Sequence, residues 1–127
     1  MRIKAITFFA ALALLPASSI ADEPGLDTDL MQSIEDTNKS LSSNIALKDA
    51  KGAQADSKEL HEMFGKVQAY FEQKGDAGDA VDLAKKSLTL TDSIVASVNH
   101  NDFDAASDSA TTLSRTCRTC HTFYKKE

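Results

Sequence analysis

The segment FDAASDSATTLSRTCRTCHTFY, residues 103–124, carries the clearest structural pattern in the chain. Apolar, aromatic or cysteine side chains recur along it at alternating steps of three and four residues. They are Phe103, Ala106, Ala110, Leu113, Cys117, Cys120 and Tyr124. This spacing places them on one face of a helix and predicts an amphipathic helix that buries that face.

Three earlier segments have the same spacing, and each carries one apolar stripe. The stripe before Lys51 has a polar interruption at Asn38. The stripes are Met31, Ile34, Asn38, Leu41 and Ile45; then Leu60, Met63, Phe64, Val67, Tyr70 and Phe71; then Val81, Ala84, Leu88, Thr91, Val95 and Val98.

Short polar stretches at 51–53, 74–79 and 99–102 separate the four segments and contain residues that cap or stop helices. No proline lies between Asp27 and Lys126. Four single-striped helices with short connections must bury their stripes together. The sequence therefore predicts an all-α fold, an antiparallel up-down-up-down four-helix bundle.

The N-terminus has the features of a secretory signal peptide. Arg2 and Lys4 precede the apolar run 5–15, and Pro16 and small residues follow, ending at Ala21. We expect residues 1–21 to be removed after Ala21 and residues 22–127 to form one domain in the periplasm. The run is too short to span a bilayer, so a retained anchor is the weaker interpretation and no stable membrane insertion is expected.

Removal of residues 1–21 from the chain of 127 leaves 106 residues, with 12 Lys and Arg against 19 Asp and Glu, a formal charge of −7. This balance argues against nucleic acid as a partner. It is compatible with electrostatic steering toward a partner protein with a basic surface.

The sequence Cys117-Arg118-Thr119-Cys120-His121 is C-x-x-C-H, the attachment motif for c-type haem. Two thiols three residues apart share one helix face, so each can form a thioether with one porphyrin vinyl group. The neighbouring imidazole of His121 can then bind the iron. The motif predicts one covalently attached haem c.

Two other interpretations of the cysteines remain. A thioredoxin-like dithiol or a disulfide would suit an oxidising compartment, but a redox C-x-x-C usually opens a helix after a strand, and here it lies near the end of the last helix. Zinc would lack a complete tetrahedral ligand set.

Antiparallel topology predicts a second iron ligand. Met31, near the start of the first helix, should lie level with His121, near the end of the last. Met63 lies farther from that end, and we expect it to serve in packing. His61, between Glu59 and Glu62, and His100, at the opposite end, are expected in solvent.

The same reasoning predicts which residues surround the haem: Ile34, Val67, Tyr70, Phe71, Val81, Ala84, Leu113 and Tyr124. Aromatic residues should gather at this end, namely Tyr70, Phe71, Phe123 and Tyr124. Cations expected nearby, which could pair with haem propionates, are Lys74, Arg115, Arg118, Lys125 and Lys126.

A C-terminal C-x-x-C-H followed by Thr122-Phe123-Tyr124-Lys125 on the last of four helices resembles the class II c-type cytochromes, the cytochrome c-prime group. Residues 29–34 and 113–124 also resemble the small periplasmic b-type four-helix cytochromes, which hold haem between a methionine and a histidine. Met31 and His121 occupy the matching places. Cys117 and Cys120 depart from the b-type pattern, and Met31 departs from typical c-prime members.

We therefore expect an electron carrier, not an enzyme, with His121 and Met31 as axial ligands and a redox partner protein. The alternative is a five-coordinate binder or sensor of small gases such as NO or CO, in which Met31 only packs near the iron. The sequence leaves a homodimer open.

Overall fold

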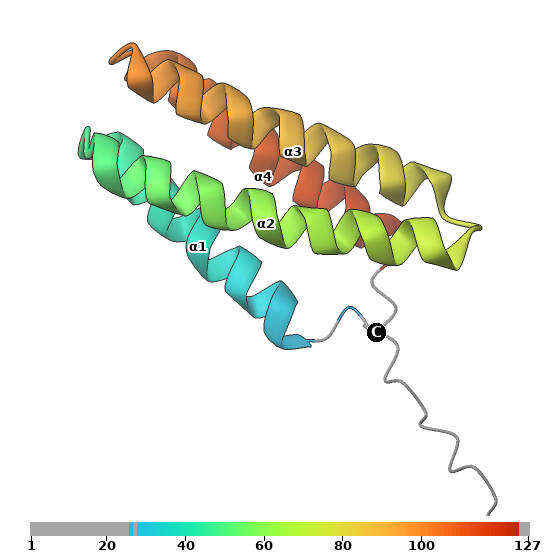
Figure 1. The fold of residues 1–127 in the computed structure, drawn as a ribbon. Coiled ribbons are helices and arrows are strands. Elements are labelled where there is room, and N and C mark those ends of the chain that lie inside the picture. Colours follow the sequence, from blue (N-terminus) through green and yellow to red (C-terminus); the bar gives the residue numbers. More distant parts are fainter. Residues whose placement is uncertain (1–25, 27, 125–127) are drawn as a thin grey trace, which may run out of the picture.

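The computed structural model describes residue 26 and residues 28–124, and this part of the chain contains helices and no strands. The helices are α1 (Thr28–Ala46), α2 (Ala50–Lys74), α3 (Gly78–Asn99) and α4 (Phe103–Tyr124). Each packs against the helix before and after it, and α1 also contacts α4 (Figure 1). The all-α, antiparallel four-helix bundle is confirmed.

The first turn lies earlier than the sequence pattern indicated. Residues 51–53 were expected in a loop, but they form the first turn of α2. The reason is a cap at Asp49, whose carboxylate oxygen Oδ1 accepts a hydrogen bond from the backbone N–H of Gly52 at 3.0 Å. The chain reverses just before this cap, where Lys48 has φ 56°.

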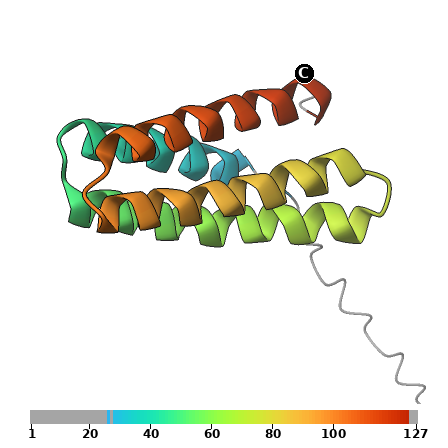
Figure 2. The same cartoon turned by 90° about the horizontal axis from the view of Figure 1, so that it is seen from above.

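The other two turns fall where they were expected. The second follows Lys74 and begins at Gly75, whose φ of 78° terminates α2. The third follows Asn99, and Asp102 caps α4 by accepting a hydrogen bond from the N–H of Ala105 at 3.0 Å. Figure 2 shows the α1–α2 and α3–α4 turns at one end of the bundle and the α2–α3 turn at the other.

The buried face of α3 shares Ala84, Thr91 and Val98 with the expected stripe and differs at the other three positions. Val81, Leu88 and Val95 are only half-buried. The buried residues of α3 are Ala80, Ala84, Ser87, Thr91, Ile94 and Val98. A polar serine and threonine fit this face because each hydroxyl donates to a carbonyl of its own helix, at 2.9 Å for Ser87 and 2.6 Å for Thr91.

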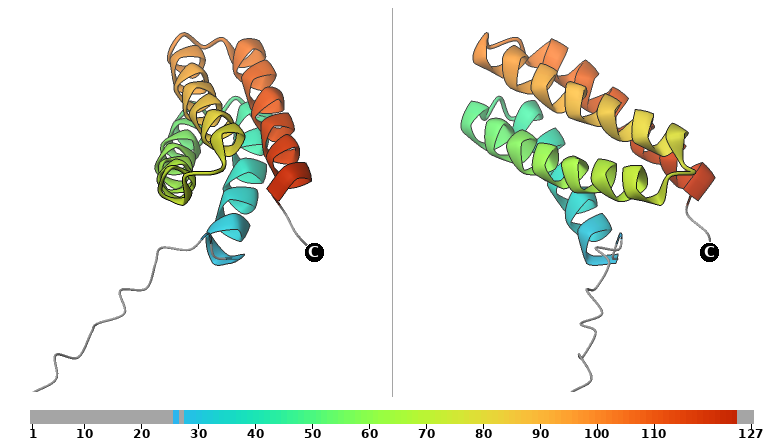
Figure 3. Two further views of the ribbon diagram at one scale, coloured as in Figure 1. Left: turned by 90° about the vertical axis from the view of Figure 1, so that its right-hand side faces the viewer. Right: turned by 45° about the vertical axis from the view of Figure 1, so that its right-hand side comes forward.

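The N-terminal half of α1 leans away from the other three helices (Figure 3). It separates at the end of the bundle that also carries the α2–α3 turn and the C-terminus of α4. This divergence opens the bundle at one end.

No described helix combines the length and hydropathy required to cross a lipid bilayer. The expected signal peptide, residues 1–21, lies outside the described residues.

Helices α1 and α2 approach closely near their shared turn. A Cβ on Gly52 would lie 2.7 Å from Asn44 Nδ2 and 2.8 Å from Asp49 Oδ2. The Asn44 amide has little freedom to move, because Nδ2 donates to Asp56 Oδ2 at 2.8 Å. The contact therefore requires glycine.

Gly52→Ala should lower the free energy of unfolding by about 1–2 kcal/mol through this overlap, although alanine favours helix more than glycine does. Gly65→Ala is the matched control, because a Cβ at Gly65 in the same helix meets nothing within 4 Å. The control should gain about 0.5–1 kcal/mol. Denaturant unfolding followed by circular dichroism measures both. Equal stabilisation by the two substitutions would contradict the close contact.

Candidate functional site

A cavity of about 490 Å³ lies at the open end of the bundle, and we call it the end cavity. All four helices contribute to its wall. Its lining residues are Leu26, Thr28, Met31, Gln32, Ile34, Glu35, Phe64, Val67, Phe71, Leu83, Ala84, Ser87, Thr116, Cys117, Cys120, His121 and Tyr124. The volume lies within the range of sites that hold small molecules and cofactors.

The four residues predicted to hold a haem all line this one cavity. Met31 reaches it from α1, whereas Cys117, Cys120 and His121 reach it from the last two turns of α4. Met31 is the fourth residue of α1, and His121 lies three residues before the end of α4. The antiparallel arrangement thus brings together groups that are 90 residues apart in the sequence.

The exposure of the four side chains predicted to hold a haem suits a site that opens to solvent. Met31, Cys117 and Cys120 are half-buried, and His121 is exposed. The thioether, the thiols and the imidazole are therefore accessible to an occupant of the end cavity. At the same time, buried apolar side chains such as Ile34, Val67 and Phe71 form its floor.

Both cysteines are free thiols. Burial, together with the smaller effect of the neighbouring Cys120, raises the pKa of Cys117 to about 11. Burial also raises the pKa of Cys120. Both groups are therefore protonated near neutral pH. Dithiol oxidoreductases instead lower the pKa of their attacking cysteine, so this environment does not favour the dithiol interpretation.

Five of the eight residues expected around the haem line the end cavity: Ile34, Val67, Phe71, Ala84 and Tyr124. The other three do not. Leu113 is fully buried in the core, and Val81 and Tyr70 are half-buried and pack against the core beside the cavity. These three lie on the correct helices, but their side chains occupy other parts of the helix surface.

Eight lining residues were not expected at the cavity: Leu26, Thr28, Gln32, Glu35, Phe64, Leu83, Ser87 and Thr116. Helical spacing could have found two of them. Phe64 precedes Val67 by three residues, and Ser87 follows Ala84 by three, so each shares a face with a residue that was identified. Thr116 was passed over because it is polar. It is buried because its hydroxyl donates to the carbonyl of Thr112 at 3.0 Å.

Aromatic side chains join α2 to α4 at this end, as expected. The rings of Tyr70 and Phe71 meet edge to face with centroids 5.1 Å apart, and Phe71 lies 5.1 Å from Tyr124. Phe123 lies 6.5 Å from Tyr124 and is 65% exposed. The cluster closes one side of the end cavity and leaves one apolar ring in solvent.

The three expected cations within the described residues do not line the cavity. Lys74, Arg115 and Arg118 are exposed, and Arg118 instead lines a smaller hollow between α1 and α4. Lys125 and Lys126 lie outside the described residues.

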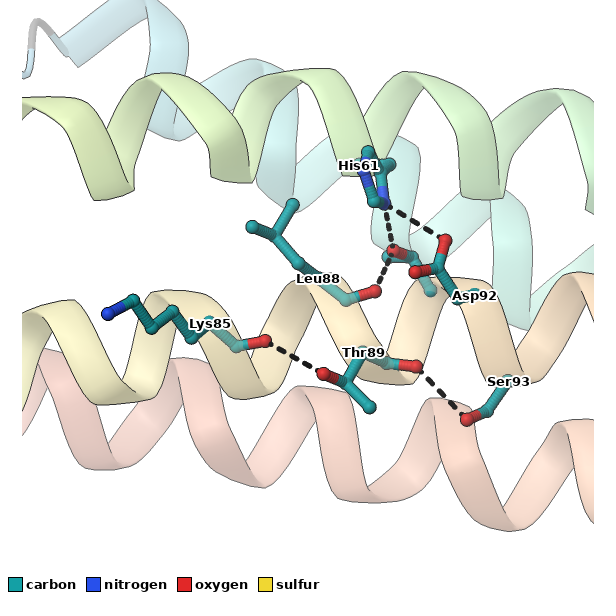
Figure 4. A network of polar contacts seen from close by, with 7 residues as sticks. His61, Lys85, Leu88, Thr89, Asp92 and Ser93 are labelled. Atoms are coloured by element: carbon teal, nitrogen blue, oxygen red, sulfur yellow. Dashed lines mark hydrogen bonds and ion pairs between the residues drawn. The ribbon is translucent and has the colours of Figure 1, made fainter.

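Met63, His61 and His100 do not line the end cavity. Met63 is 6% exposed and packs in the core, as expected. His61 was expected in solvent, but it is half-buried between α2 and α3. Its Nδ1 lies 3.1 Å from Thr91 Oγ1 and 3.2 Å from Asp92 Oδ1 (Figure 4). His100 is exposed and ends α3, with Nδ1 2.7 Å from the Ala96 carbonyl.

Within residues 28–124, no three His, Cys, Asp or Glu side chains gather as ligands for a bare metal ion. The side chains of the end cavity fit a haem better. They comprise two thiols on one helix face, an imidazole next to them, a thioether on a facing helix and an apolar floor.

Comparisons with known proteins identified no similar protein. No family model matches the chain, and neither a curated protein nor a solved structure matches it.

The protonated state of Cys117 predicts slow alkylation in protein made without haem attachment. A rise in pKa from 9.0 to about 11 lowers the thiolate fraction near neutral pH about 100-fold. In a Cys120→Ala background, the alkylation rate of Cys117 should rise about tenfold for each pH unit up to pH ~10.5.

The control is Phe123→Cys in a chain with Cys117→Ala and Cys120→Ala, because position 123 is exposed. Its rate should level off near pH 9, as for an ordinary thiol. A Cys117 rate that levels off below pH 9 would show that burial does not hold the thiol protonated.

Proposed function

We propose that the mature chain is an exported electron carrier that holds one haem c through Cys117 and Cys120. In this proposal His121 and Met31 are the axial ligands of the iron. The observation that carries it is the meeting of all four side chains at one cavity of suitable size. A haem bound there supplies a one-electron iron couple.

The chain's residues have distinct roles in this proposal. Cys117 and Cys120 tether the macrocycle to α4, so that it cannot dissociate from a small domain. His121 binds the iron from the same helix, and the soft thioether of Met31 favours the reduced state and raises the potential. The apolar floor excludes water and increases the cost of charge at the iron.

The proposal requires no proton transfer by the protein. The carboxylate on the cavity wall is Glu35, and its Oε1 lies 2.8 Å from the ammonium of Lys39. It is the one acidic residue among the described lining residues, its side chain is exposed, and an electron carrier needs no such acid.

The proposed location and the proposed redox partner rest on features of the sequence. Residues 1–21 would direct the chain to the periplasm, and the formal charge of −7 would favour a redox partner with a basic surface. No observation among the described residues bears on a homodimer.

One observation favours a second candidate function. Helix α1, which carries Met31, leans away from α4, which carries His121 (Figure 3). A methionine held away from the iron would leave one coordination position open. The chain would then be a binder or sensor of NO or CO, as in the alternative interpretation of the sequence.

Met31→Leu separates the two candidates, because leucine keeps the volume and removes the sulfur ligand. For the electron carrier, the substitution should convert ferric haem from low spin to high spin and lower the reduction potential. It should also let ferrous haem bind carbon monoxide without displacing a ligand. Absorption spectra of both oxidation states and a redox titration measure these changes.

Met63→Leu is the matched control, since Met63 is a buried methionine that does not line the end cavity. It should leave spin state and potential unchanged and alter the free energy of unfolding by less than about 1.5 kcal/mol. A parent protein that is already high spin, with no change on Met31→Leu, would favour the gas binder.

A further inference from the structure

We propose that Asn38 and Ser114 form a register lock between α1 and α4, which sets Met31 opposite His121. They are positioning residues for the iron ligands. This inference rests on the proposed function for its purpose, but the register itself can be tested without haem.

The lock is a hydrogen bond between two helices that are far apart in sequence. Nδ2 of Asn38 donates to Oγ of Ser114 at 3.0 Å, and the pair is partly buried. Ser114 pairs across to another helix, unlike neighbouring hydroxyl residues on α4. The hydroxyls of Thr112, Thr116, Thr119 and Thr122 each donate to a carbonyl of their own helix.

The position of this bond fixes the level of the ligands. Met31 lies seven residues before Asn38, and His121 lies seven residues after Ser114. The two helices run in opposite directions, so both steps lead toward the end cavity and span about 10 Å along each helix. A bond between residues 38 and 114 therefore places residues 31 and 121 at the same height. Asn38 is the eleventh of the 19 residues of α1, just past the N-terminal half that leans away from the other helices (Figure 3).

The free-energy cost of burying the Asn38 amide indicates that this residue does more than stabilise the fold. It occupies a position in the buried stripe of α1, between Ile34 and Leu41, where an apolar residue would fit. Its Oδ1 is buried and accepts no hydrogen bond from the described residues. An unpaired buried carbonyl is unfavourable, and leucine at this position would remove it. Buried asparagines in coiled coils likewise fix register at a cost in stability, because only one alignment pairs the amide.

The test uses the exported, haem-loaded protein with Asn38→Leu, Ser114→Ala and the exchanged pair Asn38→Ser with Ser114→Asn. The two single substitutions should cause loss of the low-spin ferric signature, and the exchanged pair should restore it by re-forming an amide-to-hydroxyl bond. Asn38→Leu should be at least as resistant to denaturant as the parent, so the loss cannot result from unfolding. Ser57→Ala is the control, because its buried hydroxyl bonds only within α2, to Ala53 at 2.8 Å.

A second measurement reports the register directly. Spin labels on Ser33→Cys and Thr122→Cys, both exposed positions, give the distance between α1 and α4 near the end cavity. The same two labels, placed in a chain with Cys117→Ala and Cys120→Ala, give the distance without haem. Asn38→Leu should broaden this distance distribution or shift it by a slip of up to about one turn, 5.4 Å, and Ser57→Ala should not.

The two proposals fail in different ways. A parent chain that carries no haem would end the proposed function, and the label distances would still decide the register. Asn38→Leu with an unchanged distance distribution would overturn the register lock, whatever the haem spectrum shows. Ser114→Ala provides the same decision if Asn38→Leu does not fold.

Discussion

The divergence of α1 from α4 is the constraint on which the whole site depends. Packed helices lie 8–10 Å apart and fill the space between them with side chains, so a four-helix bundle that is close-packed along its whole length has no room for a haem. Here the separation at one end leaves about 490 Å³, lined mainly by apolar groups from all four helices. Such a space lacks the van der Waals contacts of a filled core, and a flat apolar occupant would supply them. A haem tethered to α4 would then stabilise the fold as well as carry electrons.

The fold was predictable because each helix carries one stripe, and stripes in a chain of this length have few ways to be buried together. The details that failed have local causes. A capping carboxylate at Asp49 moved the start of α2 ahead of Gly52. A hydroxyl that bonds within its own helix allowed Thr116 into a buried position that apolar spacing alone would not assign.

The candidate site was also predictable only in part. Counting residues from helix ends gives height, and height was enough to bring Met31 to the same cavity as Cys117, Cys120 and His121. It does not give the direction in which a side chain leaves the helix. Leu113 and Val81 stand at suitable levels but pack elsewhere, and Phe64, on the correct face, was overlooked. The sequence does not show that Asn38 Nδ2 bonds to Ser114, nor that no described residue pairs with Asn38 Oδ1. Both facts depend on how α1 packs against α4.

The central claim is that a porphyrin is bonded through sulfur to the last helix, and the intact mass of the denatured chain tests it most directly. The protein should be produced with export in a host that attaches c-type haem, then unfolded in acid before mass measurement. If haem is attached, the mass should be that of residues 22–127 plus one haem, with both cysteines consumed. The bare polypeptide mass, with Cys117 and Cys120 still free to react with a thiol reagent, would contradict it.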